Sequence, residues 1–60
     1  MGLDWIGKRV KLIFQDSEKV LIKIGIIQQA SAEFVNIKTD IGIEIIPTSR
    51  VLRMEVLNDD

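Results

Sequence analysis

The sequence predicts an all-β fold in which five short strands bend strongly around one core to form a small barrel. The first indication is composition: the 60-residue chain contains 11 Ile and 5 Val, and β-branched residues are enriched in strands. The second is the alternation of apolar and polar residues over short segments that turn-forming residues separate. The third is size, because five strands in so short a chain cannot form two well-covered sheets. We expect one domain over residues 1–60, with a short acidic tail at residues 58–60.

The strands follow from this alternation, and the breaks between them contain residues that favour turns. The expected strands cover residues 8–14, 20–27, 35–39, 43–46 and 51–57. Gln15–Glu18 and Thr39–Gly42 are typical of tight turns, and Pro47 ends the fourth strand because it has no N–H to donate. Gly25 marks a bend or a bulge, so the second strand can serve both halves of the barrel. Leu3–Ile6 is expected to form one helical turn ahead of a glycine.

The alternation also assigns one face of each strand to the core. The expected core sets are Val10, Leu12 and Phe14; Val20, Ile22, Ile24 and Ile26; Val35 and Ile37; Ile43 and Ile45; and Leu52, Met54 and Val56. Four aliphatic residues are left on the opposite faces, namely Ile13, Leu21, Ile27 and Ile46. Either some of them reach the core through a bulge or a register change, or they form an interface between copies of the chain. Uncharged strand edges invite pairing with another copy, so we predict a homo-oligomer with these four residues at its interface.

The composition argues against several classes of function. The chain has no Cys and no His, so the usual zinc ligands and the commonest catalytic nucleophiles and bases are missing. The carboxylates fall at turns or on outward faces, and no phosphate loop of the G-x-x-x-x-G-K type is present. We therefore expect no enzyme, no cofactor and no metal. No apolar run approaches the roughly 18 residues of a membrane span, and the lack of cysteine is compatible with the reducing cytoplasm in which we place the protein.

Several segments, in their order along the chain, resemble the Sm-like (LSm) family of small barrels. The expected helical turn precedes "GKRVKLIF", and a glycine in the second strand is followed by the hydrophobic residue Ile27. The segment "FVNIK" is similar to the Met-Asn-Leu segment of the family, and "VLRMEV" resembles its closing strand. The ending "IIPTSRVLRMEV" is also similar to the Sm-like carboxy-terminal domain of the ribosome-maturation factor RimP. The resemblance spans about Leu3 to Leu57 and implies an amino-terminal helix, five bent strands and rings of subunits that bind RNA.

The resemblance also implies where RNA would bind. In Sm-like proteins an Asp and an Asn at the connection between the second and third strands build a pocket for a base. Asn36 corresponds to this Asn, one residue late when counted from Gly25, and Ser31 or Ala32 stands where the family has Asp. The Arg-Gly pair that precedes the last strand in the family has no counterpart. Bacterial Hfq proteins stack bases on an aromatic residue, and Phe34 resembles it.

The candidate RNA-binding residues are therefore Phe34, Asn36, Gln29, Arg50 and Arg53. Gln29 would contact bases from the lining of a ring, and the two arginines would hold phosphate, whose contacts position RNA without reading its sequence. Each residue also has a simpler role. Phe34 would belong to the core, Asn36 would make local hydrogen bonds, Gln29 would face solvent, and the arginines would pair with glutamates.

Two hypotheses follow for the function. In the first, a small Sm-like protein assembles into a ring and binds single-stranded RNA through its two strand connections, and ring closure multiplies weak pockets by effective concentration. In the second, an SH3-like or Sm-like module binds protein or only assembles with itself. The chain has eight Lys or Arg against nine Asp or Glu. Dedicated nucleic-acid binders usually have a basic surplus, so this balance favours the second hypothesis.

Overall fold

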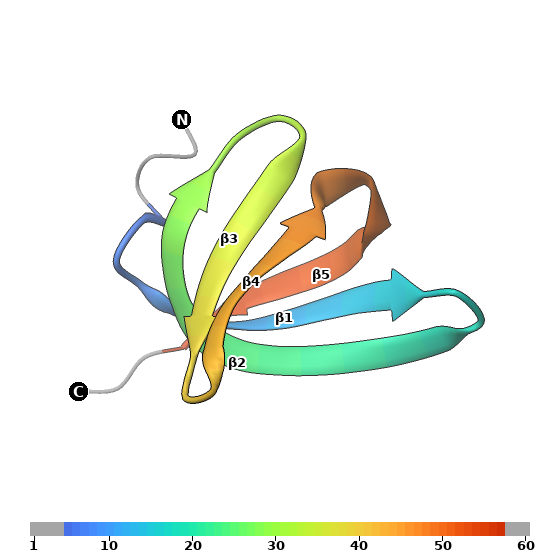
Figure 1. Ribbon diagram of the computed structural model, residues 1–60, viewed down its shortest axis with the longest axis horizontal. Coiled ribbons are helices and arrows are strands. Elements are labelled where there is room, and N and C mark those ends of the chain that lie inside the picture. The colour runs from blue at the N-terminus through green and yellow to red at the C-terminus, as the bar shows by residue number, and fades with distance from the viewer. Residues whose placement is uncertain (1–4, 58–60) are drawn as a thin grey trace.

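The computed structural model describes residues 5–57, which form one antiparallel sheet of five strands. The strands are β1 (Arg9–Asp16), β2 (Lys19–Ala30), β3 (Phe34–Thr39), β4 (Gly42–Pro47) and β5 (Val51–Val56), with the 3-10 turn η2 (Thr48–Arg50) before the last. Their order in the sheet is β4-β3-β2-β1-β5 (Figure 1). The prediction of an all-β chain with five strands is confirmed. Within the described residues no backbone pairing joins the two outer strands, β4 and β5.

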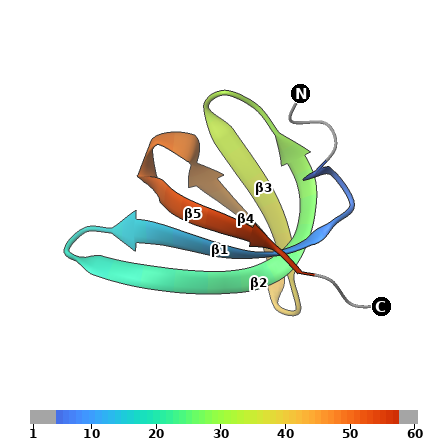
Figure 2. The same cartoon turned by 180° about the vertical axis from the view of Figure 1, so that it is seen from behind.

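Strand β2 belongs to both halves of the sheet. Its first part pairs with β1, from Lys19 opposite Asp16 to Ile26 opposite Arg9. From Ile26 onward it pairs with β3, so the two ladders meet at this residue. Figure 1 shows β2 turning sharply between the two halves, and Figure 2 shows β5 lying along the other side of β1. The predicted bend within the second strand is present.

Gly25 lies where the bend brings β2 closest to β3. A Cβ atom built on Gly25 would collide with the backbone carbonyl oxygen of Lys38 and would lie 3.0 Å from Cγ1 of Ile37. Every other residue type has a Cβ atom that would occupy this position, so steric exclusion explains why residue 25 is glycine.

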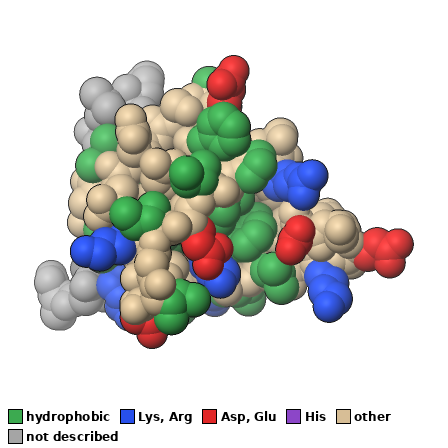
Figure 3. Space-filling model, viewed as in Figure 1, with side chains coloured by type: hydrophobic (Ala, Val, Ile, Leu, Met, Phe, Trp, Pro, Cys, Tyr) green, Lys and Arg blue, Asp and Glu red, His purple; other side chains and the backbone are tan. Residues whose placement is uncertain are grey.

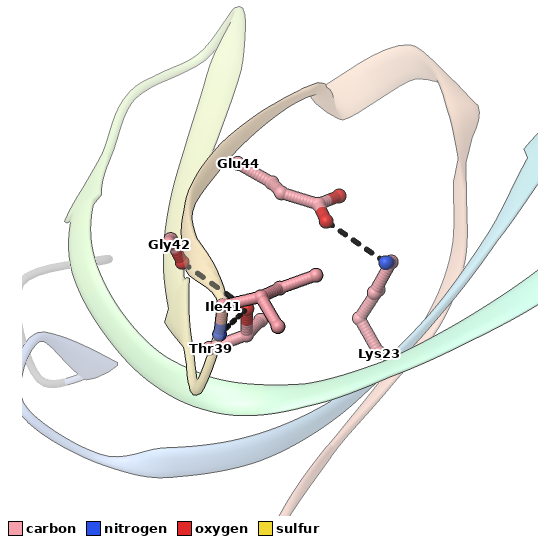
Figure 4. A network of polar contacts seen from close by, with 5 residues as sticks. All are labelled: Lys23, Thr39, Ile41, Gly42 and Glu44. Carbon is pink, nitrogen blue, oxygen red and sulfur yellow. Dashed lines mark hydrogen bonds and ion pairs between the residues drawn. The ribbon is translucent and has the colours of Figure 1, made fainter.

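Two-residue turns connect the strands of two hairpins, β1 to β2 and β3 to β4. Ser17 and Glu18 join β1 to β2, and Ser17 adopts a left-handed backbone with φ of 59°. The turn from β3 to β4 is tied by the Thr39 hydroxyl, which donates to the Gly42 carbonyl over 3.1 Å and accepts from the Ile41 N–H over 3.3 Å (Figure 4). Gly42 has a φ of 147°, a conformation that glycine adopts readily. Both predicted tight turns are confirmed.

The amino-terminal helical turn expected at Leu3–Ile6 is not shown, because its first half lies outside the described residues. Residues 5–7 form a turn in which the Lys8 N–H donates to the Trp5 carbonyl over 3.0 Å. The Gly7 N–H then donates to the Ile27 carbonyl over 2.7 Å and so ties this turn to β2. The expected acidic tail at residues 58–60 also lies outside the described residues.

Seven residues form the buried core: Val10, Leu12, Phe14, Ile27, Val35, Ile37 and Ile46. The faces predicted for the first and third strands are confirmed, since the residues assigned to the core there are buried. Leu21, Ala30, Val51 and Met54 pack against this core from its margin. In the fifth strand the predicted face is only partly inside, because Leu52 and Val56 are exposed while Met54 is partly buried.

The faces predicted for β2 and β4 are wrong. Val20, Ile22 and Ile24 are exposed, and the inner face of β2 carries Leu21, Lys23, Gly25 and Ile27. In β4, Ile43 and Ile45 are exposed, and Glu44 and Ile46 lie inside. The physical reason is the register of the ladders: Lys23 stands opposite the buried Leu12 and Glu44 stands opposite the buried Ile37, and direct cross-strand partners share a face. The two charged side chains that this register turns inward form an ion pair, with Lys23 Nζ 2.8 Å from Glu44 Oε2. Figure 4 shows the two side chains pointing toward each other across the space that the bent sheet encloses.

Because β2 and β4 turn these faces inward, the prediction that four residues lie on the outside is wrong for three of them. Ile27 is 1% exposed and Ile46 is 4% exposed, so both belong to the core, and Leu21 packs against it. Ile13 alone keeps an outward position, partly buried on β1 opposite Ile22. Ile27 and Ile46 thus belong to the core, as the alternative expected, but they do so because the inward faces of β2 and β4 are the opposite of those predicted; the bulge in β2 comes only after Ile27.

Candidate functional site

The connection between β2 and β3 is a tight turn organised by one serine. The Ser31 hydroxyl accepts from the Glu33 N–H over 3.2 Å and from the Phe34 N–H over 3.1 Å. The Ser31 N–H in turn donates to the Phe34 carbonyl over 2.8 Å. A serine side chain that satisfies backbone donors two and three residues ahead stabilises a turn locally. Ser31, one of the two residues that the resemblance places where Sm-like proteins have Asp, thus holds the backbone of the turn.

A second set of bonds joins this connection to the one between β4 and β5. The Thr48 N–H donates to the Glu33 carbonyl over 2.8 Å, and the Thr48 hydroxyl donates to the Ser31 carbonyl over 3.4 Å. Thr48 opens the 3-10 turn that follows Pro47. The two connections that the sequence suggested as ligand loops therefore lie side by side and restrain each other.

A bulge in β2 places Gln29 beside Asn36. Ile27 pairs with Ile37 and Gln29 pairs with Asn36, so Gln28 is an extra residue in the ladder. Without it Gln29 would follow Ile27 onto the inner face, because strand residues two apart share a face. With it, Gln29 turns outward and Ala30 turns toward the core opposite Val35. The bulge thus makes the outer surface of β2 polar at this point.

Next to this pair is a shallow surface depression. It is lined by Gln29, Ser31, Phe34, Asn36 and Ile45. Asn36 stands in the middle strand, with Gln29 opposite on β2 and Ile45 opposite on β4. Three of the five residues predicted to contact RNA are therefore brought together by β2 and β3, and β4 adds Ile45.

The chemistry of the depression is aromatic and amide-based. Phe34 is 47% exposed, so it does not belong to the core, and its ring has a face available for stacking. Asn36 is partly buried and Gln29 is exposed, and each amide offers donors and acceptors for the edge of a base. Ile45 adds apolar surface, and no charged residue lines the depression. Such a site suits a flat, uncharged, hydrogen-bonding group.

The two predicted phosphate-binding arginines lie elsewhere. Arg50 lines a different depression with Gln15, Ser17, Ser49 and Leu52. Arg53 Nε lies 3.0 Å from Glu55 Oε2, so it is engaged with a glutamate of its own strand rather than of a neighbouring one. Neither arginine lines the Phe34 depression. The sequence did not indicate Ile45 as a surface residue either, because the alternation in this strand assigned Ile45 to the core.

A second notable surface is apolar. We call the outward residues Ile13, Val20, Ile22 and Ile24 of β1 and β2 the outer hairpin face. Ile13 and Ile22 are direct cross-strand partners, and Ile22 is 55% exposed. Figure 3 shows hydrophobic side chains spread over the visible face of the molecule, with charged side chains of both signs among them.

Other site types receive no support from the part of the chain that the structure describes. No group of three acidic residues lies close enough within residues 5–57 to hold a metal ion. Over the same residues, no helix has the length and apolar character needed to cross a membrane. No protein-family model matches the chain, and neither a curated protein nor a solved structure matches it.

Proposed function

We propose that the chain is a small Sm-like protein that assembles with itself and binds single-stranded RNA. The observation that carries the RNA role is the Phe34 depression, in which an exposed aromatic ring lies beside two outward amide side chains. A base would stack on Phe34 and present its edge to Asn36 and Gln29. Stacking on an aromatic side chain contributes about 1–3 kcal/mol per base and tolerates any base.

The Sm-like assignment is supported by the shape of the sheet and by the bulge. Five antiparallel strands with a strongly bent second strand are what the resemblance implies. The extra residue Gln28 in the β2 ladder also accounts for the position of Asn36, which falls one residue late when counted from Gly25. On this proposal the bend closes the strands into a small barrel and the outer strands β4 and β5 have edges free for neighbouring subunits.

Self-association is supported by the balance of buried and exposed apolar residues. In the described part of the chain only seven hydrophobic residues are buried, whereas eleven large hydrophobic residues are exposed. Contiguous exposed apolar surface on a small protein marks an interaction site, and a core this small is commonly supplemented by oligomerisation. A second copy covers such surface without requiring any other partner.

The RNA role is tested by fluorescence anisotropy with labelled oligo-U and oligo-A at low salt. Phe34→Ala should weaken binding to both by roughly 5- to 150-fold, the equivalent of a lost stacking contact, and Asn36→Ala should weaken it less. Ile41→Ala is the matched control, because Ile41 is also an exposed apolar residue but lies in the β3–β4 turn. Circular dichroism of each variant checks folding. Absence of binding by the unsubstituted protein at low salt would refute the RNA role.

A second candidate function is a self-assembling or protein-binding module with no RNA role. The charge balance of −1 and the absence of cations around the Phe34 depression favour it. Light scattering tests the self-assembly that belongs to the first candidate and to the self-assembling form of the second. Ile22→Glu should shift the protein toward monomer, and Ser49→Glu, which adds the same charge to the exposed surface of η2, should not. A monomeric unsubstituted protein would contradict the first candidate and the self-assembling form of the second, and would leave only the protein-binding form.

A further inference from the structure

A second depression lies on the same outer surface as the Phe34 depression. Arg9, Ile26, Lys38, Thr39 and Asp40 contribute to its lining. It is formed where the three strands β1, β2 and β3 run side by side at the bend of β2. Unlike the Phe34 depression, it contains two cationic side chains.

The strand register brings these two cations together. Ile26 of β2 has Arg9 as its partner on β1 and Lys38 as its partner on β3. Direct cross-strand partners lie on the same face of a sheet, and both cations are exposed. Their Cα atoms are two strand spacings apart, about 10 Å, which two long side chains span easily. An anion above Ile26 is therefore within reach of both.

Within residues 5–57 neither cation takes part in an ion pair. The ion pairs of the described residues are Lys23 with Glu44 and Arg53 with Glu55. Asp40 is the one carboxylate among the described residues that line the depression, so two positive charges face one negative charge there. The hydroxyl of Thr39 already donates to the Gly42 carbonyl, so Arg9 and Lys38 are the available donors.

The depression also continues the surface of the Phe34 depression. Lys38 follows Asn36 by two residues on β3, and residues two apart in a strand share a face and lie about 7 Å apart. This separation is comparable to the distance between a base-binding contact and the neighbouring backbone of the same strand of RNA. Aromatic stacking beside a cationic track is the usual arrangement for binding single strands.

We propose that Arg9 and Lys38 form a phosphate-binding site that holds the RNA backbone next to the nucleotide whose base occupies the Phe34 depression. The inference rests on the proposed RNA-binding function and adds the residues that contact the backbone. Such contacts fix the position of the RNA and are indifferent to its sequence. The site replaces Arg50 and Arg53, which the sequence had suggested for this role.

The test is the salt dependence of RNA binding. Arg9→Gln and Lys38→Gln are compared with the unsubstituted protein by anisotropy with labelled oligo-U and oligo-A, between roughly 50 and 200 mM salt. Each substitution removes one phosphate contact, so it should reduce the slope of log K against log salt by about 0.7. It should also weaken binding to the two RNAs equally. Lys38→Arg should retain the slope of the unsubstituted protein.

Two controls make the result specific. Lys19→Gln removes the same charge from the tip of the β1–β2 hairpin and should leave the slope unchanged. Phe34→Ala should weaken binding without changing the slope, because stacking releases no counterions. Slopes for Arg9→Gln and Lys38→Gln that equal the slope for Lys19→Gln would overturn the phosphate site and leave the RNA role intact. Failure of the unsubstituted protein to bind would overturn both.

Discussion

Replacing Gly25 by alanine should destabilise the fold more than its single added methyl group suggests. The new Cβ would collide with the Lys38 carbonyl oxygen, and it would lie 3.0 Å from both the Lys38 carbonyl carbon and Ile37 Cγ1. The nearest obstacle is backbone, and this backbone is held in the ladder between β2 and β3 by the pairing of Ile26 with Lys38. Relief therefore requires the two strands to separate at the bend.

The magnitude follows from these contacts. Inserting a methyl group into a packed site costs about 1–3 kcal/mol, and a backbone obstacle places the cost in the upper part of this range. Alanine recovers about 0.4–1 kcal/mol by restricting the unfolded chain, which leaves a net loss of about 2 kcal/mol. A single core in a chain of this size supplies about 3–5 kcal/mol in total. The substitution should thus remove about half of the free energy of unfolding.

The assay is urea and thermal unfolding followed by circular dichroism at one fixed protein concentration, because the proposed self-assembly would make stability depend on concentration. With an m-value near 1 kcal/mol/M, the urea midpoint of Gly25→Ala should fall by about 2 M, and Tm should fall by about 8–16 °C. Gly7→Ala is the control: Gly7 has a φ of +87° but no atom within 4 Å of a built Cβ, so only backbone strain of about 1 kcal/mol applies.

Two results would refute the reasoning about Gly25. One is a midpoint of Gly25→Ala equal to that of the unsubstituted protein. The other is a negligible cost of Gly25→Ala in an Ile37→Ala background, because alanine lacks the Cγ1 atom and the Ile37 side chain, not the Lys38 backbone, would then be the obstacle.

Three further predictions concern the strand faces, the β2–β3 turn and the ion pair. Ile27→Ala should cost about 2–5 kcal/mol in chemical denaturation and Ile22→Ala less than about 1 kcal/mol; the reverse order would mean that β2 turns its other face inward. Ser31→Ala should cost about 0.5–1.5 kcal/mol and speed amide exchange at the two residues whose N–H groups it caps, and unchanged exchange would contradict the capping role. A double-mutant cycle with Lys23→Met and Glu44→Gln should give a coupling of about 0.2–1 kcal/mol that declines with added salt, whereas a coupling of zero would show that the pair contributes nothing to closing the bend.

The sequence predicted the number of strands, both two-residue turns and the bend, because these depend on local residue types. It failed on the inner faces of β2 and β4, because in both strands the outer face carries more isoleucine than the inner one and the more apolar face was assigned to the core. The two errors have one cause. Lys23 and Glu44 lie inside because they stand opposite Leu12 and Ile37, which are buried, and no pattern within a single strand specifies this register.

The candidate site could be predicted only where it depends on the alternation within one strand. Phe34 and Asn36 are two residues apart on one strand, so their common face follows from the alternation alone. Gln29 joins them only because Gln28 is a bulge. Ile45 joins them only because β4 turns outward the face that the sequence had assigned to the core. The cationic pair of Arg9 and Lys38 depends on the register of three strands, which no local pattern specifies.

The order of the strands has a consequence for how the chain folds. Strands β1 to β4 pair with their neighbours in sequence, and each hairpin can form by closing a short loop. The pairing of β5 with β1, in which Val56 lies opposite Val10, joins segments from the two ends of the described chain and must wait for nearly all of the rest. Until β5 docks, β1 presents a hydrogen-bonding edge in a largely formed sheet. Refolding should therefore become less efficient as protein concentration rises, through capture of this edge by another chain.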